Sequence, residues 1–256
     1  DLHLAPETAA LCRTIVSTFS ELPVERIWGE WEKWATQSVR PSRGLAVLEE
    51  TVWLQHFPEI AALRGTPQEP EWHPEGDVFI HTMIMLEMLA PDAPLELCLA
   101  VLLHDIAKPP CRSVDADSGR IRFNGHDTLG AHMAENILRR LRYPNDTIAA
   151  VVPMVARHMQ FMNVQKMRVA KLKRFMAEAT FDMEMELHRV DCGSSNGFTD
   201  NYEFLNAKAI EFASEPLIPP PLVSGRDLIT LGLSPGPRFK EILEAFETEQ
   251  LEGRIS

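Results

Sequence analysis

Two adjacent ionisable residues, His104 and Asp105, end the apolar run Leu95–Leu103, so both side chains are expected to be buried. Burying a carboxylate beside an imidazole is costly unless a partner compensates the charge, and a metal ion is the usual partner. Other segments with helical patterns add further candidate ligands, namely His81, His126, His158 and Asp191. Imidazole and carboxylate ligands suit Mn, Fe, Co, Ni, Zn or Mg, and the lack of thiolates argues against a structural zinc site. The joint pattern therefore predicts a divalent-metal centre with one or two ions.

The predicted ligands divide into two sets. The set for one ion comprises His81, His104, Asp105 and Asp191, and the set for a second ion comprises His126 and His158, with Asp105 as a bridge. Two such ions polarise a phosphate and generate hydroxide near neutral pH, which is the usual route to phosphoester hydrolysis. Lys108 lies one helical turn beyond His104 and is expected to stabilise charge on the phosphoryl oxygens. Asp105 and Lys108 are thus the predicted catalytic residues.

The composition is that of an acidic globular chain. Its 256 residues are 45% hydrophobic and carry a formal net charge of −12, which argues against broad, charge-driven binding of nucleic acid. No run approaches the ~18 apolar residues of a membrane helix, and the N-terminus has no signal-peptide pattern. Because no membrane helix is expected, we expect no membrane partner. The cysteines are far apart, so we expect reduced thiols and a cytoplasmic location. Because the chain begins at Asp1 without methionine, we expect a processed chain or a fragment of a longer one.

Helical periodicity dominates the sequence and predicts an all-α fold, a helical bundle with additional helical segments at both ends. Helices are expected over residues 6–22, 23–39, 41–56, 77–90, 94–108, 127–142, 145–158, 168–178, 180–193 and 237–246. Residues 119–123 alternate as a short hairpin or extended loop, and residues 216–221 form a proline-rich linker. The expected domains are a neck-like segment over 1–65, a metal-binding domain over 66–212, and a linker with C-terminal helices over 213–256.

The ordered series of histidines and aspartates resembles the HD superfamily of metal-dependent phosphohydrolases. Several longer segments resemble the C-terminal, HD-containing part of bacterial tRNA nucleotidyltransferases, which are also called poly(A) polymerase-like or CCA-adding proteins. These segments are Pro41–Leu45, Gly65–Gln68, Trp72–Thr82, Leu102–Pro109, Gly119–Asp127, Leu187–Cys192, Asn201–Phe204 and Leu228–Leu243. Together they extend over most of residues 25–255, and their combination is specific.

The resemblance implies a hydrolase acting on nucleotides or on phosphoesters at RNA ends, such as 2′,3′-cyclic phosphates. It also implies that residues 1–65 resemble the neck and body that hold tRNA and a polymerase head, which makes Arg40 and Arg43 candidate contacts for RNA or nucleotide. The sequence has no counterpart of that head, since Asp115-Ala-Asp117 lies in a polar loop without a preceding glycine-rich turn. We therefore expect no addition of CCA to tRNA unless another polypeptide supplies the head.

Two departures from the family pattern bear on activity. Ala107 replaces the glycine that is common after the His-Asp-Ile sequence, a change that a helix tolerates. Asn196 stands where the family often has histidine, which would weaken the activity if that histidine assists the chemistry.

Two other functions stay open at the level of sequence. In the first, the helices bind RNA or dock a polymerase subunit, and the HD site is idle. In the second, a pair of iron ions at the same ligands uses dioxygen. Bound metal and RNA affinity distinguish the first alternative, and dependence of turnover on dioxygen distinguishes the second.

Overall fold

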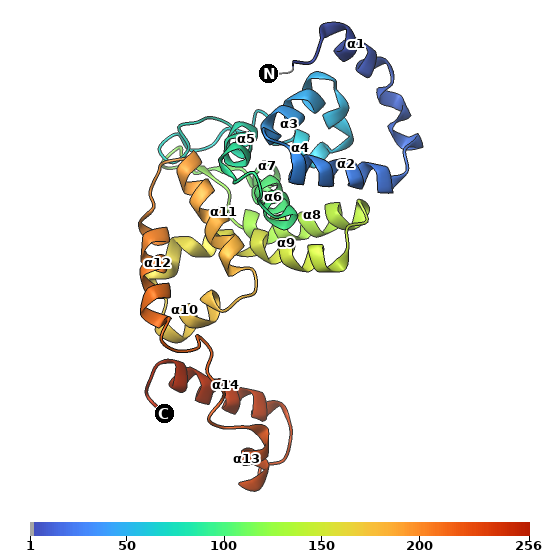
Figure 1. Ribbon diagram of the computed structural model, residues 1–256. Coiled ribbons are helices and arrows are strands. Elements are labelled where there is room, and N and C mark those ends of the chain that lie inside the picture. The colour runs from blue at the N-terminus through green and yellow to red at the C-terminus, as the bar shows by residue number, and fades with distance from the viewer. Residues whose placement is uncertain (1–2) are drawn as a thin grey trace. The chain divides into compact units, whose positions relative to one another are not determined.

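The computed structural model describes residues 3–256 and confirms the all-α prediction, since the regular elements of this range are helices apart from one pair of short strands (Figure 1). The N-terminal elements are α1 (Pro6–Thr14), the 3₁₀ helix η1 (Val16–Glu21), α2 (Val24–Gln37), α3 (Pro41–Glu50), the 3₁₀ helix η2 (Trp53–His56) and α4 (Pro58–Ala61). The central elements are α5 (Val78–Met88), α6 (Leu95–Leu103), α7 (Lys108–Cys111), β1 (Ser113–Val114), β2 (Ile121–Arg122), α8 (His126–Arg140) and α9 (Asn145–Arg157). The last elements are the 3₁₀ helix η3 (His158–Lys166), α10 (Val169–Met176), α11 (Phe181–Ser194), α12 (Asp200–Phe212), α13 (Gly225–Thr230) and α14 (Pro237–Leu251).

The chain forms two compact units. Unit 1 extends to Met159 and includes residues 183–199, and unit 2 comprises residues 160–182 and 200–256. Every predicted metal ligand falls within unit 1. The domain boundaries expected from the sequence, after residues 65 and 212, stay predictions.

The core of unit 1 is built on helices that are apolar nearly all round. In α6, every residue from Leu97 to Leu103 is buried, and in α5 both Val78 and Phe79 are fully buried. A helix without a polar face must be covered on all sides. Helices α2 and α9 pack on α6, α3 packs on α5, and α8 lies beside α9 (Figure 1). Within residues 3–256, no helix combines the length and the apolar character that crossing a bilayer requires.

The helix that precedes the His-Asp pair ends earlier than expected. The sequence predicts helix over 94–108, but α6 ends at Leu103, and residues 104–107 form a turn before the short helix α7. Pro109 and Pro110 lie in the first turn of α7, where the missing N–H groups have no intrahelical partner to lose. The prolines thus begin a helix instead of ending one, and the His-Asp pair lies on the turn between the two helices.

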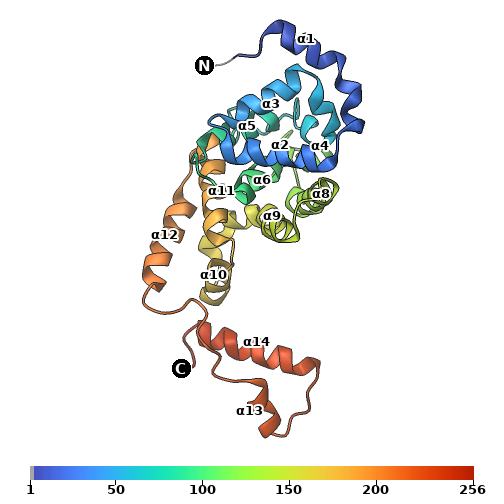
Figure 2. The same cartoon turned by 45° about the vertical axis from the view of Figure 1, so that its right-hand side comes forward.

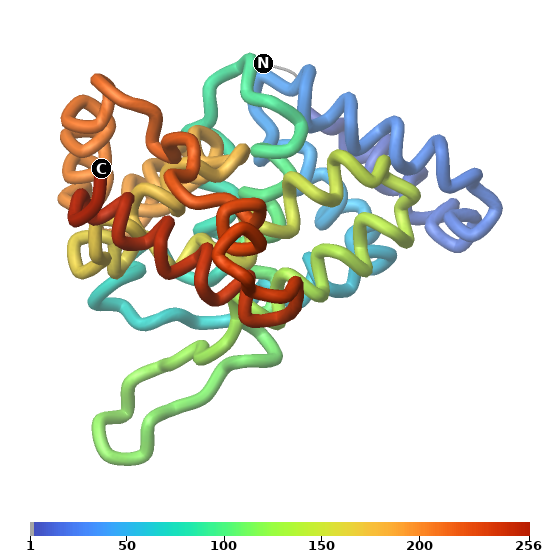
Figure 3. The backbone as a smooth tube through the Cα atoms, turned by 90° about the horizontal axis from the view of Figure 1, so that it is seen from below, coloured from blue at the N-terminus to red at the C-terminus, as the bar shows by residue number. Residues whose placement is uncertain are grey.

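A long loop between α7 and α8 confirms the expected hairpin. Strand β1 pairs antiparallel with β2, with Ser113 opposite Arg122, and the loop projects from the helices of unit 1 (green in Figure 3). At its tip, Asp115 accepts hydrogen bonds from the backbone N–H and the hydroxyl of Ser118, at 2.9 and 2.8 Å. These contacts agree with reading Asp115-Ala-Asp117 as a loop and not as a polymerase site.

Unit 2 holds the C-terminal helices. The expected terminal helix is present as α14, and α13 lies beside it (Figure 2). Helix α10 packs on α14, where the Arg174 guanidinium pairs with Glu247 at 2.6 Å and the backbone N–H of Ala170 donates to Glu252 at 3.0 Å. Ser224 and Asp227 form a capping box at the start of α13. Helices α12 and α13 were not expected from the sequence, because neither segment has strong apolar periodicity.

Candidate metal centre

Five segments of unit 1 bring the six predicted ligands into one group, which we call the metal-site cluster. Helix α5 carries His81, the turn after α6 carries His104 and Asp105, α8 begins at His126, α9 is followed by His158, and α11 carries Asp191. Gly125 has a φ of 77°, a left-handed conformation that suits glycine, and this turn starts α8 at the histidine. Except for Asp191, which is partly exposed, the residues of the cluster are buried.

Asp105 lies at the centre of the metal-site cluster. On one side, its Oδ2 is 3.0 Å from Nε2 of His104 and 3.8 Å from Nε2 of His81. On the other side, its Oδ1 is 3.4 Å from Nε2 of His126 and 3.9 Å from Nε2 of His158. Each carboxylate oxygen therefore faces two imidazoles, which is the arrangement that a bridging ligand requires.

The donor atoms form two sets that match the predicted division. Asp191 joins the first side, with its Oδ1 3.2 Å from Nε2 of His81. In each set the donor atoms lie within 4.8 Å of one another, and the sets are His81 with His104 and Asp191, and Asp105 with His126 and His158; a third group within the same distance, His73 with Glu75 and His81, lies outside the predicted division. The geometry thus offers room for one ion on either side of Asp105.

All four imidazoles of the cluster turn the same nitrogen toward Asp105. In three rings, Nδ1 lies 2.7–2.9 Å from a backbone carbonyl three residues earlier, and the pairs are His104 with Val101, His126 with Phe123, and His158 with Val155. In His81, Nδ1 lies 2.7 Å from Oε1 of Glu75. Because these oxygens only accept, Nδ1 carries the proton, and the lone pair of a neutral ring is at Nε2. This is the tautomer that coordinates a metal through Nε2.

Unpartnered atoms show that the residues present fit a divalent metal. Among the described residues, Nε2 of His81, Nε2 of His104 and both carboxylate oxygens of Asp105 are buried and make no hydrogen bond, although the Lys108 ammonium forms an ion pair with Oδ2 of Asp105. A buried polar group without a partner costs about 1–3 kcal/mol. In addition, Nε2 of His126 lies 3.1 Å from Nε2 of His158, so two lone pairs would repel without a proton or a cation near them. Nitrogen and oxygen donors without thiolate suit Ni, Mn, Co, Fe or Mg.

The two carboxyl groups of the cluster are ionised at neutral pH. Burial alone would raise the pKa of Asp105, but the imidazole of His104 and the ammonium of Lys108 hold it well below its usual range. Burial likewise opposes ionisation of Asp191, but the imidazole of His81, 3.2 Å away, lowers the pKa of Asp191 below its usual range. Both side chains are therefore ready to coordinate a cation.

The pKa values of His81 and His158 are shifted in opposite directions. Burial disfavours charge on His81, but the nearby carboxylates of Asp191 and Glu75 outweigh it and raise the pKa of His81 to about 9. Burial, reinforced by the charge of His104, lowers the pKa of His158 to about 4. Without metal, the His81 ring is therefore protonated on both nitrogens and positively charged at neutral pH, whereas the His158 ring is neutral. Because an imidazole must be neutral to coordinate, metal binding at His81 releases a proton.

Lys108 is held inside the protein beside Asp105. Its Nζ lies 2.7 Å from Oδ2 of Asp105 and donates to Oε1 of Gln68 at 2.7 Å, and both Lys108 and Gln68 are buried. The Phe123 ring lies 5.4 Å from the same ammonium. Lys108 thus brings a positive charge to the centre, and its predicted role toward phosphoryl oxygens stays a prediction. The sequence did not predict the contact of Gln68 with Lys108, although the segment Gly65–Gln68 belongs to the family resemblance.

Arg40 and Arg43 are not part of the metal-site cluster. They lie at the start of α3, and the exposed Arg40 pairs with Glu87 at 3.3 Å. Glu87 also accepts hydrogen bonds from the backbone and the hydroxyl of Ser42, at 3.0 and 2.6 Å. Their predicted contact with RNA or nucleotide stays a prediction.

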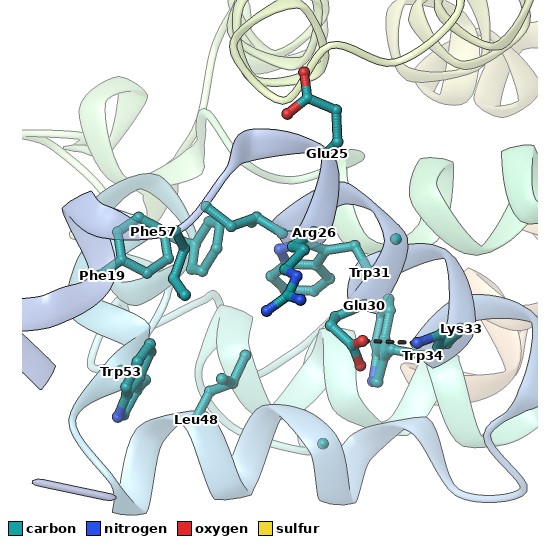
Figure 4. Close-up of a pocket in the computed structure, with 14 residues that line it drawn as sticks. Phe19, Glu25, Arg26, Glu30, Trp31, Lys33, Trp34, Leu48, Trp53 and Phe57 are labelled. Carbon is teal, nitrogen blue, oxygen red and sulfur yellow. Dashed lines mark hydrogen bonds and ion pairs between the residues drawn. The ribbon is translucent and has the colours of Figure 1, made fainter. Parts of the chain in front are cut away.

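A second feature of unit 1 is a cavity of about 830 Å³ among the first helices. Aromatic side chains line much of it, and Figure 4 labels them as Phe19, Trp31, Trp34, Trp53 and Phe57. Arg26 and Lys33 also border this cavity, and Lys33 pairs with Glu30 at 2.7 Å (Figure 4). The sequence did not predict this cavity, because aromatic residues at helical spacing are typical of a packed core and not of a cavity wall.

Two protein families match parts of this chain. Residues 78–187 match the HD domain family, and residues 1–63 match the family described as the probable RNA and SrmB-binding site of polymerase A. The HD match includes the metal-site cluster except Asp191.

Several curated proteins are similar to this chain. An A-adding tRNA nucleotidyltransferase of Deinococcus radiodurans is 32% identical over 225 residues, which are 84% of this chain and 51% of the relative. A CC-adding tRNA nucleotidyltransferase of Thermus thermophilus is 32% identical over 221 residues, 85% of this chain and 51% of the relative. A multifunctional CCA protein of Ralstonia nicotianae is 37% identical over 161 residues, 61% of this chain and 36% of the relative. The chain thus spans about half the length of the first two relatives.

Proposed function

The chain is an HD-domain relative of the tRNA nucleotidyltransferases, and from this relationship we propose that it is a metal-dependent phosphohydrolase. The observation that carries the proposal is the arrangement around Asp105, where four imidazole Nε2 atoms face the two oxygens of one buried carboxylate. A structural core histidine needs no such convergence, whereas a pair of metal ions does.

The residues of the centre have distinct roles in this proposal. His81, His104 and Asp191 would hold one ion, His126 and His158 would hold a second, and Asp105 would contribute to both sets. A divalent ion there supplies Lewis-acid polarisation of a phosphoryl oxygen and lowers the pKa of water. Lys108 stabilises negative charge on the phosphoryl group, and Gln68 holds its ammonium in place.

The proposed substrates are nucleotides or RNA ends that carry a phosphoester, such as a 2′,3′-cyclic phosphate. Two observations support this class. The relatives are named for their action on tRNA, and residues 1–63 match a probable RNA-binding family. The ions of the centre would act on the phosphoester, and the N-terminal helices, with Arg40 and Arg43, would hold the RNA.

Hydrolysis of 2′,3′-cyclic AMP by the full chain tests the proposal. The metal-stripped protein is assayed with Ni, Mn, Co, Fe or Mg, beside the variants His104→Ala and Asp105→Ala. The exposed His132 gives a matched control, His132→Ala, outside the cluster. We expect metal-dependent turnover in the wild type and the control, and loss of turnover in both cluster variants. A folded protein that binds metal but hydrolyses neither this ester nor nucleotide monoesters would refute the proposal.

A second candidate function is an RNA-binding or subunit-docking body with an idle HD site. The match of residues 1–63 and the aromatic cavity bordered by Arg26 and Lys33 favour it. A separate nucleotidyltransferase head would then be the partner. Fluorescence anisotropy with labelled tRNA separates the two functions, since this candidate predicts affinity that survives His104→Ala and a wild-type protein without hydrolase activity.

A further inference from the structure

Glu75 is a buried carboxylate that none of the predicted ligand sets uses. Its side chain is 7% exposed, and its Oε1 lies 2.7 Å from Nδ1 of His81 and 2.9 Å from Nδ1 of His73. Its Oε2 is buried and has no hydrogen-bond partner among the described residues. The ion pairs of the described residues give Glu75 the imidazoles of His73 and His81 as partners and no lysine or arginine. An ordinary structural salt bridge therefore does not explain why this charge is buried.

The loop that carries Glu75 is fixed at both ends. The Asp77 carboxylate accepts hydrogen bonds from the N–H groups of Ile80, at 2.9 Å, and Gly65, at 2.8 Å, so it caps α5 and ties the start of the loop to it. The backbone N–H of Val78 also donates to the carbonyl of Thr66 at 3.1 Å. Gly76 has a φ of 127°, a conformation that L side chains rarely adopt, and it links Glu75 to the cap. These contacts place the carboxylate beside the first turns of α5, where His81 lies.

His81 differs in this respect from the other imidazoles of the metal-site cluster. The rings of His104, His126 and His158 donate from Nδ1 to neutral backbone carbonyls. His81 donates to a carboxylate, which makes the ring a more basic ligand and fixes its orientation more strongly. The two sides of Asp105 are thus unequal, because the His81 side carries the two negative charges of Asp191 and Glu75 in addition, against one positive charge from Lys108 beside Oδ2 of Asp105.

We propose that Glu75 is a positioning residue, which acts through His81 to make the His81–His104–Asp191 set bind its metal ion more tightly than the His126–His158 set. The inference rests on the proposed metal-binding function and deepens it. It assigns an order of occupancy, in which the His81 set fills first. His73 shares Oε1 of Glu75 and holds the carboxylate from its other side.

The test is metal affinity in the full chain. Wild-type protein and Glu75→Gln are titrated with Co²⁺ and followed by visible absorption and by calorimetry. The wild type is expected to show two classes of site. Glu75→Gln keeps an acceptor oxygen but removes the charge, so we expect the affinity of the tighter class to fall about 10–100-fold and the weaker class to stay unchanged. Glu71→Gln is the matched control in the same loop, because Glu71 is half exposed and pairs with Arg120.

A second measurement uses the wild type alone, so it does not depend on how a variant folds. Nitrogen-15 NMR of the histidines in the Zn²⁺ form is expected to show His81 protonated at Nδ1 and coordinated at Nε2. Coordination through Nδ1, or equal tight-class affinities of the wild type and Glu75→Gln, would overturn the inference. Failure of the proposed function looks different, since metal would bind with the expected inequality but no phosphoester would be cleaved. A wild type that binds no metal would overturn both.

Discussion

The buried ion pair between Asp105 and Lys108 is expected to dominate the stability of the metal-free protein. The two charged atoms lie 2.7 Å apart, and the side chains are 2% and 7% exposed, so solvent screens them little. Replacing Asp105 with asparagine leaves the buried ammonium with the amide oxygens of Gln68 and of the new side chain as acceptors, but without a counter-charge. Removing one partner of a buried pair costs about 3–5 kcal/mol, so Asp105→Asn should lower the melting temperature by about 6–20 °C.

A double-mutant cycle isolates the pair from the single changes. Lys108→Met removes the buried ammonium at similar volume, and in Asp105→Asn/Lys108→Met neither buried charge remains. We expect the double variant to lose less stability than the sum of the single losses, by about 0.5–3 kcal/mol. Asp92 is exposed, so Asp92→Asn serves as a control that should stay within about 0.5 kcal/mol of the wild type.

Urea unfolding in the presence of a chelator measures these differences. All five tryptophans lie at or before Trp72, so their fluorescence reports the unfolding of unit 1. With metal at one hundred times its dissociation constant, the wild type should gain about 2.7 kcal/mol, and Asp105→Asn should gain none. Additive losses in the cycle, or a loss below about 1 kcal/mol for Asp105→Asn, would show that the pair is not the source of the stability.

Two further predictions concern packing and acid stability. A Cβ on Gly44 would lie 2.5 Å from the Trp34 ring, whereas one on Gly29 would meet nothing within 4 Å. Gly44→Ala should therefore destabilise the protein by about 1 kcal/mol and Gly29→Ala should stabilise it by a similar amount, and equal melting temperatures would contradict this reasoning. The depressed pKa of His158, about 4, adds stability that is complete above its unfolded value near 6.5 and is lost as the pH falls toward 4. In the chelated protein, the free energy of unfolding of His158→Gln, measured with urea, should thus fall less between pH 6.5 and 4 than that of the wild type, by up to about 3 kcal/mol, and an equal fall in both proteins would refute the assignment.

The sequence predicted those parts of the site that depend on residue type and burial. The apolar runs around His81 and His104 showed that these imidazoles lie inside the protein, and the helical spacing predicted most of the segments that carry ligands. The structure places the predicted ligands in one cluster, and their role as ligands stays a prediction.

The parts that the sequence did not predict depend on tertiary contacts. Glu75 lies in a proline-rich loop whose path is set by hydrogen bonds to Asp77, and spacing along the chain does not reveal which ring it reaches. The earlier end of α6 was missed because two prolines usually stop a helix, whereas here Pro109 and Pro110 begin one. His73 and Glu75 are two residues apart in the sequence, but only the fold shows that the same oxygen of Glu75 bonds the rings of both His73 and His81.

Three histidines of the cluster are oriented by their own chain. His104, His126 and His158 each bond a carbonyl only three residues earlier, so a segment of four residues contains both the ligand and the group that aims it. The hydrogen bond that orients the ring is therefore kept when such a segment is moved to the end of another helix. These four-residue segments could therefore be transferred to other helical scaffolds as metal ligands, because no second element is needed to supply the hydrogen bond to Nδ1, although the new scaffold must still pack around the ring. His81 could not be moved in this way, because its direction depends on a loop that folds back from outside its helix.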